Sequence, residues 1–336
     1  MRLPADVVAR LRKHYQGRSV CVTGGAGFIG SHLVDALLSL GAVVTVIDDL
    51  SNSTLAHLEM HIELEPEQIT FVYGSILDDA SLREAMKSAE VVFHLAAMGS
   101  VPRSVDEPGR TWAVNATGTV RVLEAARSRG ARVVLAGSSS VYGDSVVMPR
   151  VETQQPAPVS PYALSKLAAE QAVSVWHRTY GHPGVTLRFF NVFGPRQSAD
   201  SAYAAVVASF AARLLAGHPA MIFGDGSQTR DFTFVGNAVL ATLLAGSVDA
   251  GRVAGEVINV GTGHRISVLE LAKEMTSLAG ARDVEPLFAD AREGDVAHSV
   301  ADITKARTLL GYSVVTDLRE GLEETMAWYR KAMAGT

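Results

Sequence analysis

Short apolar runs rich in β-branched residues recur along the first 190 residues of the chain, and most are followed by a longer stretch of mixed polarity. The apolar runs predict strands at 18–23, 42–48, 69–74, 90–96, 131–137 and 185–190. The stretches near 28–40, 80–88, 110–129 and 160–180 predict helices. Alternating strands and helices indicate a doubly wound, parallel α/β sheet. Because the strands are continuously apolar, helices are expected to cover both faces of that sheet.

This alternation loosens after residue 190. We expect a helix near 202–216, a short strand of sequence MIF, helices near 234–246 and 266–280, and two C-terminal helices. The pattern predicts a Rossmann-type domain over residues 1–190 and a smaller α/β domain over residues 191–336. A segment near 232–260 is expected to return to the first domain, because residues 257–261 (VINVG) resemble another buried strand. Residues 1–17 predict an amphipathic helix on the outside of the core, with no chemistry.

The composition of the 336 residues narrows the class of protein. Hydrophobic residues make up 48% and charged residues 19%, as in globular proteins. The formal net charge of −5 gives no electrostatic reason to expect nucleic acid or an anionic membrane as a partner. No apolar run approaches the roughly 18 residues of a membrane span, and neither end has the pattern of a targeting signal. We therefore expect a cytoplasmic, soluble protein, in which the single cysteine, Cys21, is a core residue.

A glycine-rich stretch, TGGAGFIGSHL (23–33), follows the first predicted strand and opens the first helix of the sheet. Gly24, Gly27 and Gly30 have the spacing that allows a tight turn, a close approach of pyrophosphate and close packing of helix on strand. Asp48 ends the next strand, where a carboxylate accepts hydrogen bonds from a ribose and repels a 2′-phosphate. The stretch therefore predicts a site for NAD rather than NADP. The alternative is a purely structural turn with a surface aspartate.

Tyr162 and Lys166 lie four residues apart in SPYALSKLAAEQ (160–171), at the start of a predicted helix. This spacing places both side chains on one helical face. A phenol with a pKa of about 10 is a weak base at neutral pH, but a nearby ammonium and a cationic nicotinamide would both favour the phenolate. An isolated motif of this kind is more often part of an ordinary amphipathic helix. The glycine-rich loop upstream favours a catalytic pair.

Taken in order along the chain, these motifs resemble those of a known family. They are TGGAGFIG, HLAA (94–97), Asn115-x-x-Gly118-Thr119, SSSVYG (138–143), the tyrosine–lysine pair, RFFNVFGPRQ (188–197) and GDGSQTRDF (224–232). From residue 18 onward the chain resembles the extended short-chain dehydrogenase/reductase family. Within it the chain is most similar to the UDP-hexose 4-epimerases, especially those that accept N-acetylated sugars. The resemblance implies NAD as a bound prosthetic group in the first domain and a UDP-sugar in the second.

The resemblance implies roles for the serines at 138–140. It places Ser138 on the C4 hydroxyl of the sugar, beside Tyr162 and Lys166, and these three form the predicted catalytic set. Related sugar-nucleotide 4,6-dehydratases have Asp and Glu at the two positions occupied here by Ser139 and Ser140. Without those carboxylates, the elimination of water has no proton carriers. The resemblance therefore implies epimerisation and argues against dehydration.

The resemblance also implies which residues hold the two ligands. Asn191 is expected near the substrate diphosphate, Arg230 and Arg292 on the phosphates, and Asp295 on the uridine ribose. Relatives usually have Asp at the position of Ser75, and its absence could weaken NAD retention. The predicted NAD-binding residues are Gly24, Gly27, Phe28, Ile29, Gly30, Asp48, Asn52, Ser75, Ile76, Leu95, Ala96, Ala97, Asn115, Tyr162 and Lys166. The predicted substrate-binding residues are Gly99, Ser100, Ser139, Ser140, Asn191, Gln197, Ala205, Arg230, Arg292, Asp295 and Ser299.

These observations predict an isomerase that inverts C4 of a UDP-hexose by transient oxidation to a 4-keto sugar. The resemblance places Gly99, Ala204, Ala205 and Ser299 in the wall of the sugar pocket, and their small side chains favour UDP-GlcNAc and UDP-GalNAc as substrates. The alternatives are a UDP-glucose or UDP-glucuronate epimerase, a decarboxylase, and a catalytically silent NAD-binding regulator. Relatives specific for uronates tend to have Thr in place of Asn191 and a basic residue in place of Ser198. No metal is implied, and a homodimer is a family expectation.

Overall fold

A computed structural model describes residues 4–199, 205–281, 284–291 and 296–334 of the chain. Its centre is a seven-stranded sheet in the order β11-β6-β5-β4-β1-β2-β3, and every neighbouring pair is parallel. This is the predicted Rossmann-type fold, and that prediction is confirmed. The strands are β1 (Ser19–Thr23), β2 (Val43–Asp48), β3 (Ile69–Tyr73), β4 (Val91–His94), β5 (Arg132–Ser138), β6 (Gly184–Phe189) and β11 (Val257–Val260).

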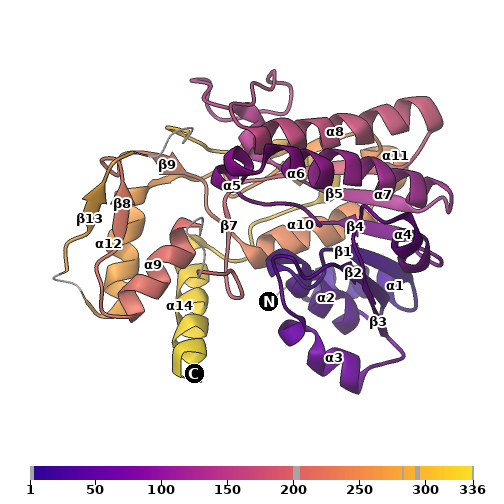
Figure 1. Ribbon diagram of the computed structural model, residues 1–336, viewed down its shortest axis with the longest axis horizontal. Helices are drawn as coiled ribbons and strands as arrows, with labels where there is room; N and C mark the ends of the chain where they lie inside the picture. The colour runs from indigo at the N-terminus through magenta and orange to yellow at the C-terminus, as the bar shows by residue number, and fades with distance from the viewer. Residues whose placement is uncertain (1–3, 200–204, 282–283, 292–295, 335–336) are drawn as a thin grey trace.

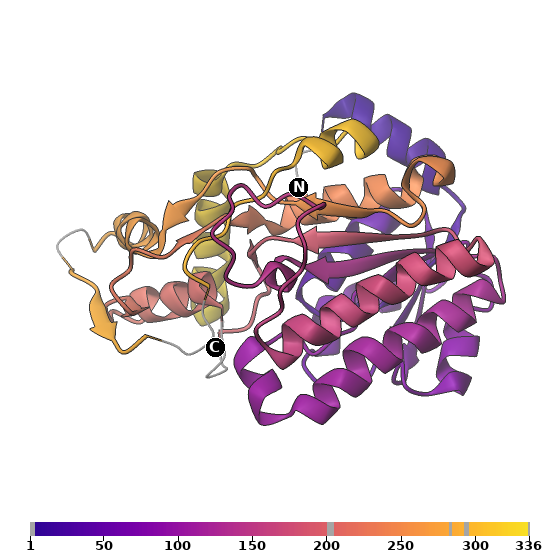
Figure 2. The same ribbon diagram turned by 90° about the horizontal axis from the view of Figure 1, so that it is seen from above.

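Helices cover both faces of this sheet, as Figures 1 and 2 show. One face carries α2 (Phe28–Ser39) and α10 (Val235–Ser247), with α1 (Ala5–Tyr15) packed outside α10. The other carries α4 (Asp79–Ala85), α7 (Gly118–Arg127) and α8 (Pro161–Tyr180). Successive residues of β1 enter different cores, since Cys21 packs on the second face and its neighbours Val20 and Val22 on the first. Burial on both faces explains why the strands have no polar alternation.

The N-terminal helix α1 is amphipathic and contacts the core through two buried residues. Leu11 and Tyr15 of α1 are fully buried, and the Tyr15 hydroxyl donates a hydrogen bond of 2.6 Å to the carbonyl oxygen of Leu243 in α10. The helix lies on the outer side of α10, as expected from the sequence, and these two residues attach it to the core. A tyrosine ring can be buried where its hydroxyl has a hydrogen-bond partner, and a sequence does not show whether that partner exists.

The segment after β10 (Thr233–Phe234) lies against the large sheet. Helix α10 packs on α2, and β11 pairs with β6 from Val257↔Thr186 to Val260↔Phe189. The rest of the second half lies beyond the carboxyl ends of the strands (Figure 1). This part contains α9 (Val206–Leu215), β8 (Met221–Phe223), β9 (Thr229–Arg230), β12 (Ile266–Ser267), α12 (Val268–Ala279), β13 (Leu287–Ala289) and α14 (Leu318–Ala334). The exception is α13 (Thr304–Leu310), which packs against β11 and α10 at the large sheet.

Several short elements have too few residues to show a hydrophobic period. They are η1 (Leu55–His57), α3 (Glu59–Leu64), α5 (Val101–Asp106), η3 (Ser139–Tyr142), β7 (Val192–Phe193) and α11 (Ala250–Val253). The helix predicted over 110–129 is also interrupted. It begins as α6 (Pro108–Trp112), passes through a π-helical turn, η2 (Ala113–Thr117), and continues as α7. Among the described residues, no helix is long and apolar enough to cross a membrane.

Candidate active site

A cavity of about 1170 Å³ follows the carboxyl ends of β1, β2, β4 and β5 and continues between the sheet and the second half of the chain. This is the crevice in which open α/β sheets bind ligands. It brings together most of the predicted site residues, although they are spread over 276 positions from Gly24 to Ser299. The predicted residues that line it are Gly24, Gly27, Phe28, Ile29, Gly30, Asp48, Asn52, Ser75, Ile76, Leu95, Ala96, Ala97, Gly99, Ser100, Ser138, Ser139, Ser140, Tyr162, Lys166, Asn191, Gln197, Ala205, Arg230 and Ser299.

The glycine-rich loop fits a dinucleotide. Gly24 has a φ of +71°, a left-handed conformation, and a Cβ there would lie 2.6 Å from the backbone nitrogen of Ala96. A Cβ on Gly30 would lie 2.1 Å from the carbonyl oxygen of Gly24, so the first turn of α2 can pack on the loop only without a side chain. Gly27 is the N-cap of α2, and no side chain caps this helix. The first backbone N–H groups of α2 therefore have no side-chain partner, and such a helix start at a cavity wall is suited to bind an anion.

Asp48 fixes the far end of the same loop. Its carboxylate accepts hydrogen bonds from the backbone nitrogens of Ala26 (3.0 Å) and Leu50 (2.9 Å) and from the hydroxyl of Ser53 (3.0 Å). These bonds orient a buried carboxylate at the edge of the cavity, next to Asn52. The arrangement leaves room for a further hydrogen bond, because a carboxylate offers about four acceptor positions.

The catalytic set lies where the cofactor end of the cavity meets its substrate end. Helix α8 begins at Pro161, and the hydroxyl of its N-cap, Ser160, accepts a hydrogen bond of 3.1 Å from the backbone nitrogen of Ala163. Tyr162 lies in this first turn, and its phenol is hydrogen-bonded to Ser138. The buried ammonium of Lys166 donates a 3.0 Å hydrogen bond to the carbonyl oxygen of Ala136.

Burial shifts the pKa of both groups. It raises the pKa of the Tyr162 phenol, and the hydrogen bond with Ser138 counteracts only part of that effect. Burial lowers the pKa of Lys166 to about 8. Each shift has the same cause, since removal from water disfavours whichever form is charged. At neutral pH the chain's own groups therefore hold a protonated phenol beside a lysine that still carries most of its charge.

The three serines after β5 form a short hydroxyl cluster. The hydroxyls of Ser138 and Ser140 lie 2.8 Å apart, and the backbone nitrogen of Ser140 donates to the Ser138 hydroxyl over 3.2 Å. The 3₁₀ turn η3 begins directly after Ser138 and points all three residues into the cavity wall. The cluster offers neutral donors and acceptors beside Tyr162.

Asn115 lies behind the cavity wall. It is buried and does not line the cavity. Its amide nitrogen donates to the carbonyl oxygen of Met98 (3.2 Å) and to the hydroxyl of Ser165 (3.0 Å), and its amide oxygen accepts from the backbone nitrogen of Met98 (2.8 Å). These bonds engage its donors and its acceptor with protein groups. Asn115 therefore positions the cavity wall at Met98, and its contact with NAD stays a prediction.

A buried histidine extends this network. The Nε2 of His94 lies 3.0 Å from the hydroxyl of Thr119, which itself donates to the carbonyl oxygen of Asn115, so Nε2 carries the hydrogen. Nδ1 then accepts from the hydroxyl of Thr23 over 2.7 Å, and that hydroxyl accepts from the backbone nitrogen of Ala96. Burial lowers the pKa of His94 to about 3, so the ring stays neutral. His94 ties the ends of β1 and β4 to α7 and takes no part in the chemistry.

The substrate end of the cavity is built from separate loops of the second half. Asn191 donates from its side-chain nitrogen to the carbonyl oxygen of Asp231 (3.3 Å). Arg230 donates to the carbonyl oxygens of Thr229 (2.9 Å) and Ala297 (3.2 Å). Gln197 Oε1 is buried with no hydrogen-bond partner among the described residues, so it is available to a ligand. Arg292, Asp295 and Ala204 lie outside the described residues.

Sequence reasoning missed other residues of this wall. Arg150 is fully buried, and its guanidinium donates to the carbonyl oxygens of Val147, Gly143 and His298. It follows no strand and belongs to no motif, so no sequence signal marked it. The apolar part of the wall consists of Phe189, Val206, Val207, Met221, Phe223, Phe232 and Val268. The MIF strand was predicted as an element, but not as a wall of the cavity.

Comparison with known proteins defines the class. The profile of the NAD dependent epimerase/dehydratase family matches residues 20–261. The UDP-glucose 4-epimerase of Mycolicibacterium smegmatis is 43% identical over 312 residues, which are 92% of this chain and 97% of that protein. The chain therefore belongs to the NAD dependent epimerase/dehydratase family. The predictions of the family, of an enzyme and of NAD as its cofactor are confirmed.

Two solved structures are similar over nearly the whole chain. The UDP-glucose 4-epimerase of Thermotoga maritima, solved with UDP-glucose, has a TM-score of 0.87 and 38% identity, covering 94% of this chain and 99% of that one. The UDP-N-acetylglucosamine 4-epimerase of Methanobrevibacter ruminantium, solved in complex with UDP-N-acetylmuramic acid, has a TM-score of 0.88 and 36% identity, covering 95% and 100%. These relatives share the 4-epimerase reaction on UDP-sugars and differ in the sugar.

Proposed function

We propose that the protein is a UDP-sugar 4-epimerase that interconverts UDP-GlcNAc and UDP-GalNAc. One observation carries the reaction type. Ser138, Tyr162 and Lys166 meet in one cavity, at the junction of a dinucleotide cradle and a second, differently built pocket. An enzyme that oxidises and re-reduces the same sugar carbon needs this arrangement, because cofactor and substrate must meet at a single proton-transfer group.

The roles of the three side chains follow from their contacts. Tyr162 accepts the proton of the sugar C4 hydroxyl and returns it after the sugar has turned over. Ser138, hydrogen-bonded to that phenol, holds the C4 oxygen in line. NAD, when bound, supplies a hydride acceptor and donor for C4, and its cationic ring favours the phenolate that burial disfavours. Lys166 contributes a second positive charge, and its bond to Ala136 keeps its ammonium at the end of β5.

The choice of an N-acetylated sugar rests on space in the wall. A Cβ on Gly99 would meet no atom within 4 Å, so the wall is open at this position. Ser299 lines the cavity with a small side chain that is only 9% exposed, and its backbone nitrogen donates to the carbonyl oxygen of Thr229 (3.0 Å). Ala205 is a third small residue of the lining. Bulky residues at these positions would compete with a 2-acetamido group for volume.

The test is the substitution Ser299→Tyr, with kcat/KM measured for UDP-GlcNAc, UDP-GalNAc, UDP-Glc and UDP-Gal. A tyrosine forced into a packed wall against an acetamido group costs about 1–3 kcal/mol, which corresponds to a selective loss of about 5- to 150-fold for the acetylated pair. Ser299→Ala is the matched control, since it removes the hydroxyl without adding volume. Equal losses for the acetylated and plain sugars in Ser299→Tyr would show that the acetamido group lies elsewhere.

The alternatives give different results in the same assay. A UDP-glucose epimerase would turn over only the plain pair in the wild type. A uronate enzyme would act on UDP-GlcA, for which neither Asn191 nor Ser198 offers a charged partner. A silent regulator would bind NAD and leave every UDP-sugar unchanged, as followed by proton NMR of the C4 position.

A further inference from the structure

A bridge of polar side chains crosses the cofactor end of the cavity. The strand order places β1 between β4 and β2, so the glycine-rich loop after β1 lies between the loops that follow those two strands. Asn52 comes from the loop after β2, and Arg103 comes from α5, after β4. The guanidinium of Arg103 donates a 2.6 Å hydrogen bond to the side-chain oxygen of Asn52. A contact between the two outer loops therefore spans the cradle that lies between them.

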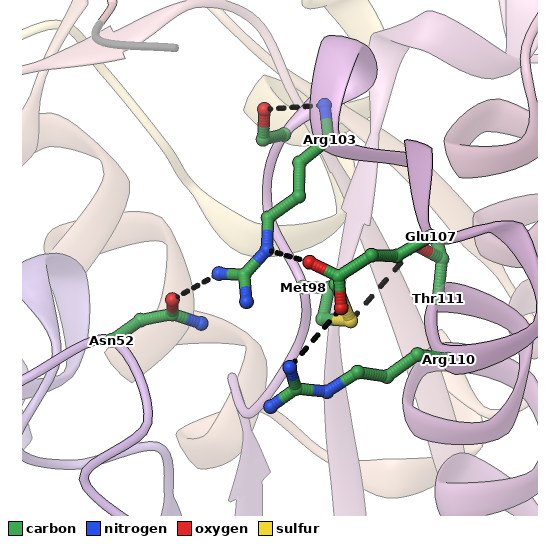
Figure 3. A network of polar contacts seen from close by, with 7 residues as sticks. Asn52, Met98, Arg103, Glu107, Arg110 and Thr111 are labelled. Atoms are coloured by element: carbon green, nitrogen blue, oxygen red, sulfur yellow. Dashed lines mark hydrogen bonds and ion pairs between the residues drawn. The ribbon is translucent and has the colours of Figure 1, made fainter. Parts of the chain in front are cut away.

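Arg103 is held in this position by its neighbours, as Figure 3 shows. Its Nε donates to one carboxylate oxygen of Glu107 over 2.9 Å, one helical turn further along the chain. The other oxygen of Glu107 pairs with Arg110 at 3.1 Å. The backbone nitrogen of Arg103 donates to the hydroxyl of Ser100, the N-cap of α5. The guanidinium therefore extends toward Asn52 in a partly exposed position, with 25% of its side chain exposed.

The charge of this cluster suits an anion. Two guanidinium groups share one carboxylate, which leaves a net charge of about +1 in a protein whose formal net charge is −5. Asn52, Arg103 and Arg110 all line the cavity, as do Gly27 and the acidic Asp48 and Asp49. A planar guanidinium is well matched to phosphate oxygens. An ion pair that served only the protein surface would be expected to point into solvent and not to line the cavity.

We propose that Arg103, through its bridge to Asn52, retains NAD in the cradle and so sets the rate at which the cofactor leaves. This inference rests on the proposed function, in which NAD returns unchanged after each turnover and gains from staying bound. Arg103 acts on retention, and the proton transfer at Tyr162 does not use it.

The experiment measures the release of NAD from the loaded protein. Wild type, Arg103→Gln, Asn52→Ala and the double variant are loaded with radiolabelled NAD and chased with excess unlabelled NAD, and the label retained is followed over time. We expect each single variant to release NAD about tenfold faster, the size of a lost hydrogen bond to a charged group. The double variant should release it no faster than the faster single variant, since both changes break the same bridge.

Arg127→Gln is the matched control. Arg127 pairs with Glu124 at 3.0 Å, three residues apart and half-exposed like the Arg110–Glu107 pair, but it lies outside the cavity wall. Its release rate should equal that of the wild type. Release from Arg103→Gln within twofold of the wild type would overturn the proposal, and so would independent, multiplying effects in the double variant. If Arg103→Gln does not fold, Asn52→Ala decides the matter from the other loop.

These outcomes separate the two proposals. A wild type that retains NAD but epimerises no UDP-sugar contradicts the proposed function and leaves the bridge intact. A wild type that epimerises UDP-sugars and whose bridge variants release NAD at the normal rate contradicts only the bridge. A wild type that holds no NAD overturns both.

Discussion

Replacing Arg188 by Met removes one partner of a buried ion pair beneath the active site. Arg188 lies on β6, in register with Gly137, and its Nε and Nη2 donate to the two carboxylate oxygens of Glu170 over 2.7 and 2.6 Å. The side chains are 3% and 1% exposed. The guanidinium also lies 4.5 Å from the centre of the Tyr142 ring. Glu170 is one helical turn after Lys166, so this pair attaches the catalytic helix to the sheet.

The size of the effect follows from the burial. A charge left without its partner in the interior costs about 3–5 kcal/mol. With an unfolding entropy of about 2.1 cal/mol/K per residue, a chain of 336 residues changes its melting temperature by about 1.4 °C for each kcal/mol. Arg188→Met should therefore lower the melting temperature by about 4–7 °C. The double variant Glu170→Met/Arg188→Met should recover most of that loss, because no unpaired charge remains.

Thermal unfolding measures the melting temperatures and urea unfolding measures the free energies, both followed by circular dichroism with the same NAD concentration in every sample. The control is Arg127→Gln, which breaks a half-exposed pair and should change the free energy of unfolding by less than about 1 kcal/mol. A loss below about 1 kcal/mol for Arg188→Met would refute the argument from burial. A double variant as unstable as the single one would show that the loss comes from packing around Tyr142 and not from charge.

Three further predictions concern the site. Tyr162→Phe should keep bound NAD and lower kcat at least about a hundredfold, because only the phenol oxygen accepts the C4 proton; a wild-type rate would exclude Tyr162 as the base. Asp48 should make the NAD-stripped protein bind NAD more tightly than NADP, and equal affinities by calorimetry would show that its carboxylate does not face the ribose. Burial lowers the folded-state pKa of Lys166 to about 8, so the unfolded chain binds this proton more tightly between pH 8 and about 10. The free energy of unfolding of the stripped protein should then rise across that window, by up to about 1.4 kcal/mol per pH unit, and the rise should be absent in Lys166→Met.

The sheet could be predicted because its strands carry a strong local signal. Each strand is buried on both faces and is therefore apolar throughout, and the predicted and observed bounds differ by at most two residues at either end. The helix expected over 110–129 shows where this signal stops. The hydrophobic periodicity of this segment does not indicate the π turn at Ala113–Thr117, where the side chain of Asn115 is hydrogen-bonded to Met98. That turn depends on a contact between segments 17 residues apart, which a local pattern does not contain.

The ligand site was predictable only where its residues stand in motifs. The glycine-rich loop and the tyrosine–lysine pair each combine a fixed spacing with a fixed position on an element, so their side chains can be placed before the fold is known. Arg150 has no such context, and the stretch around Arg103, GSVPRS (99–104), resembles a sugar-binding wall without giving the arginine itself a role. Only the fold shows that Arg103 reaches Asn52 and that the buried Arg150 belongs to the cavity wall.

Polar residues at the carboxyl ends of parallel strands can either face a ligand or fasten the wall behind it, and residue type does not distinguish the two. His94 and Ser138 both end or follow such strands, and both are surrounded by hydroxyls. His94 lies under α7, where Thr23 and Thr119 take up both of its ring nitrogens, so nothing remains for a ligand. Ser138 lies at the start of a 3₁₀ turn that bends away from the sheet and leaves its hydroxyl beside Tyr162. The helix that follows each strand therefore determines whether the polar side chain at the strand end faces the cavity or is hydrogen-bonded within the protein.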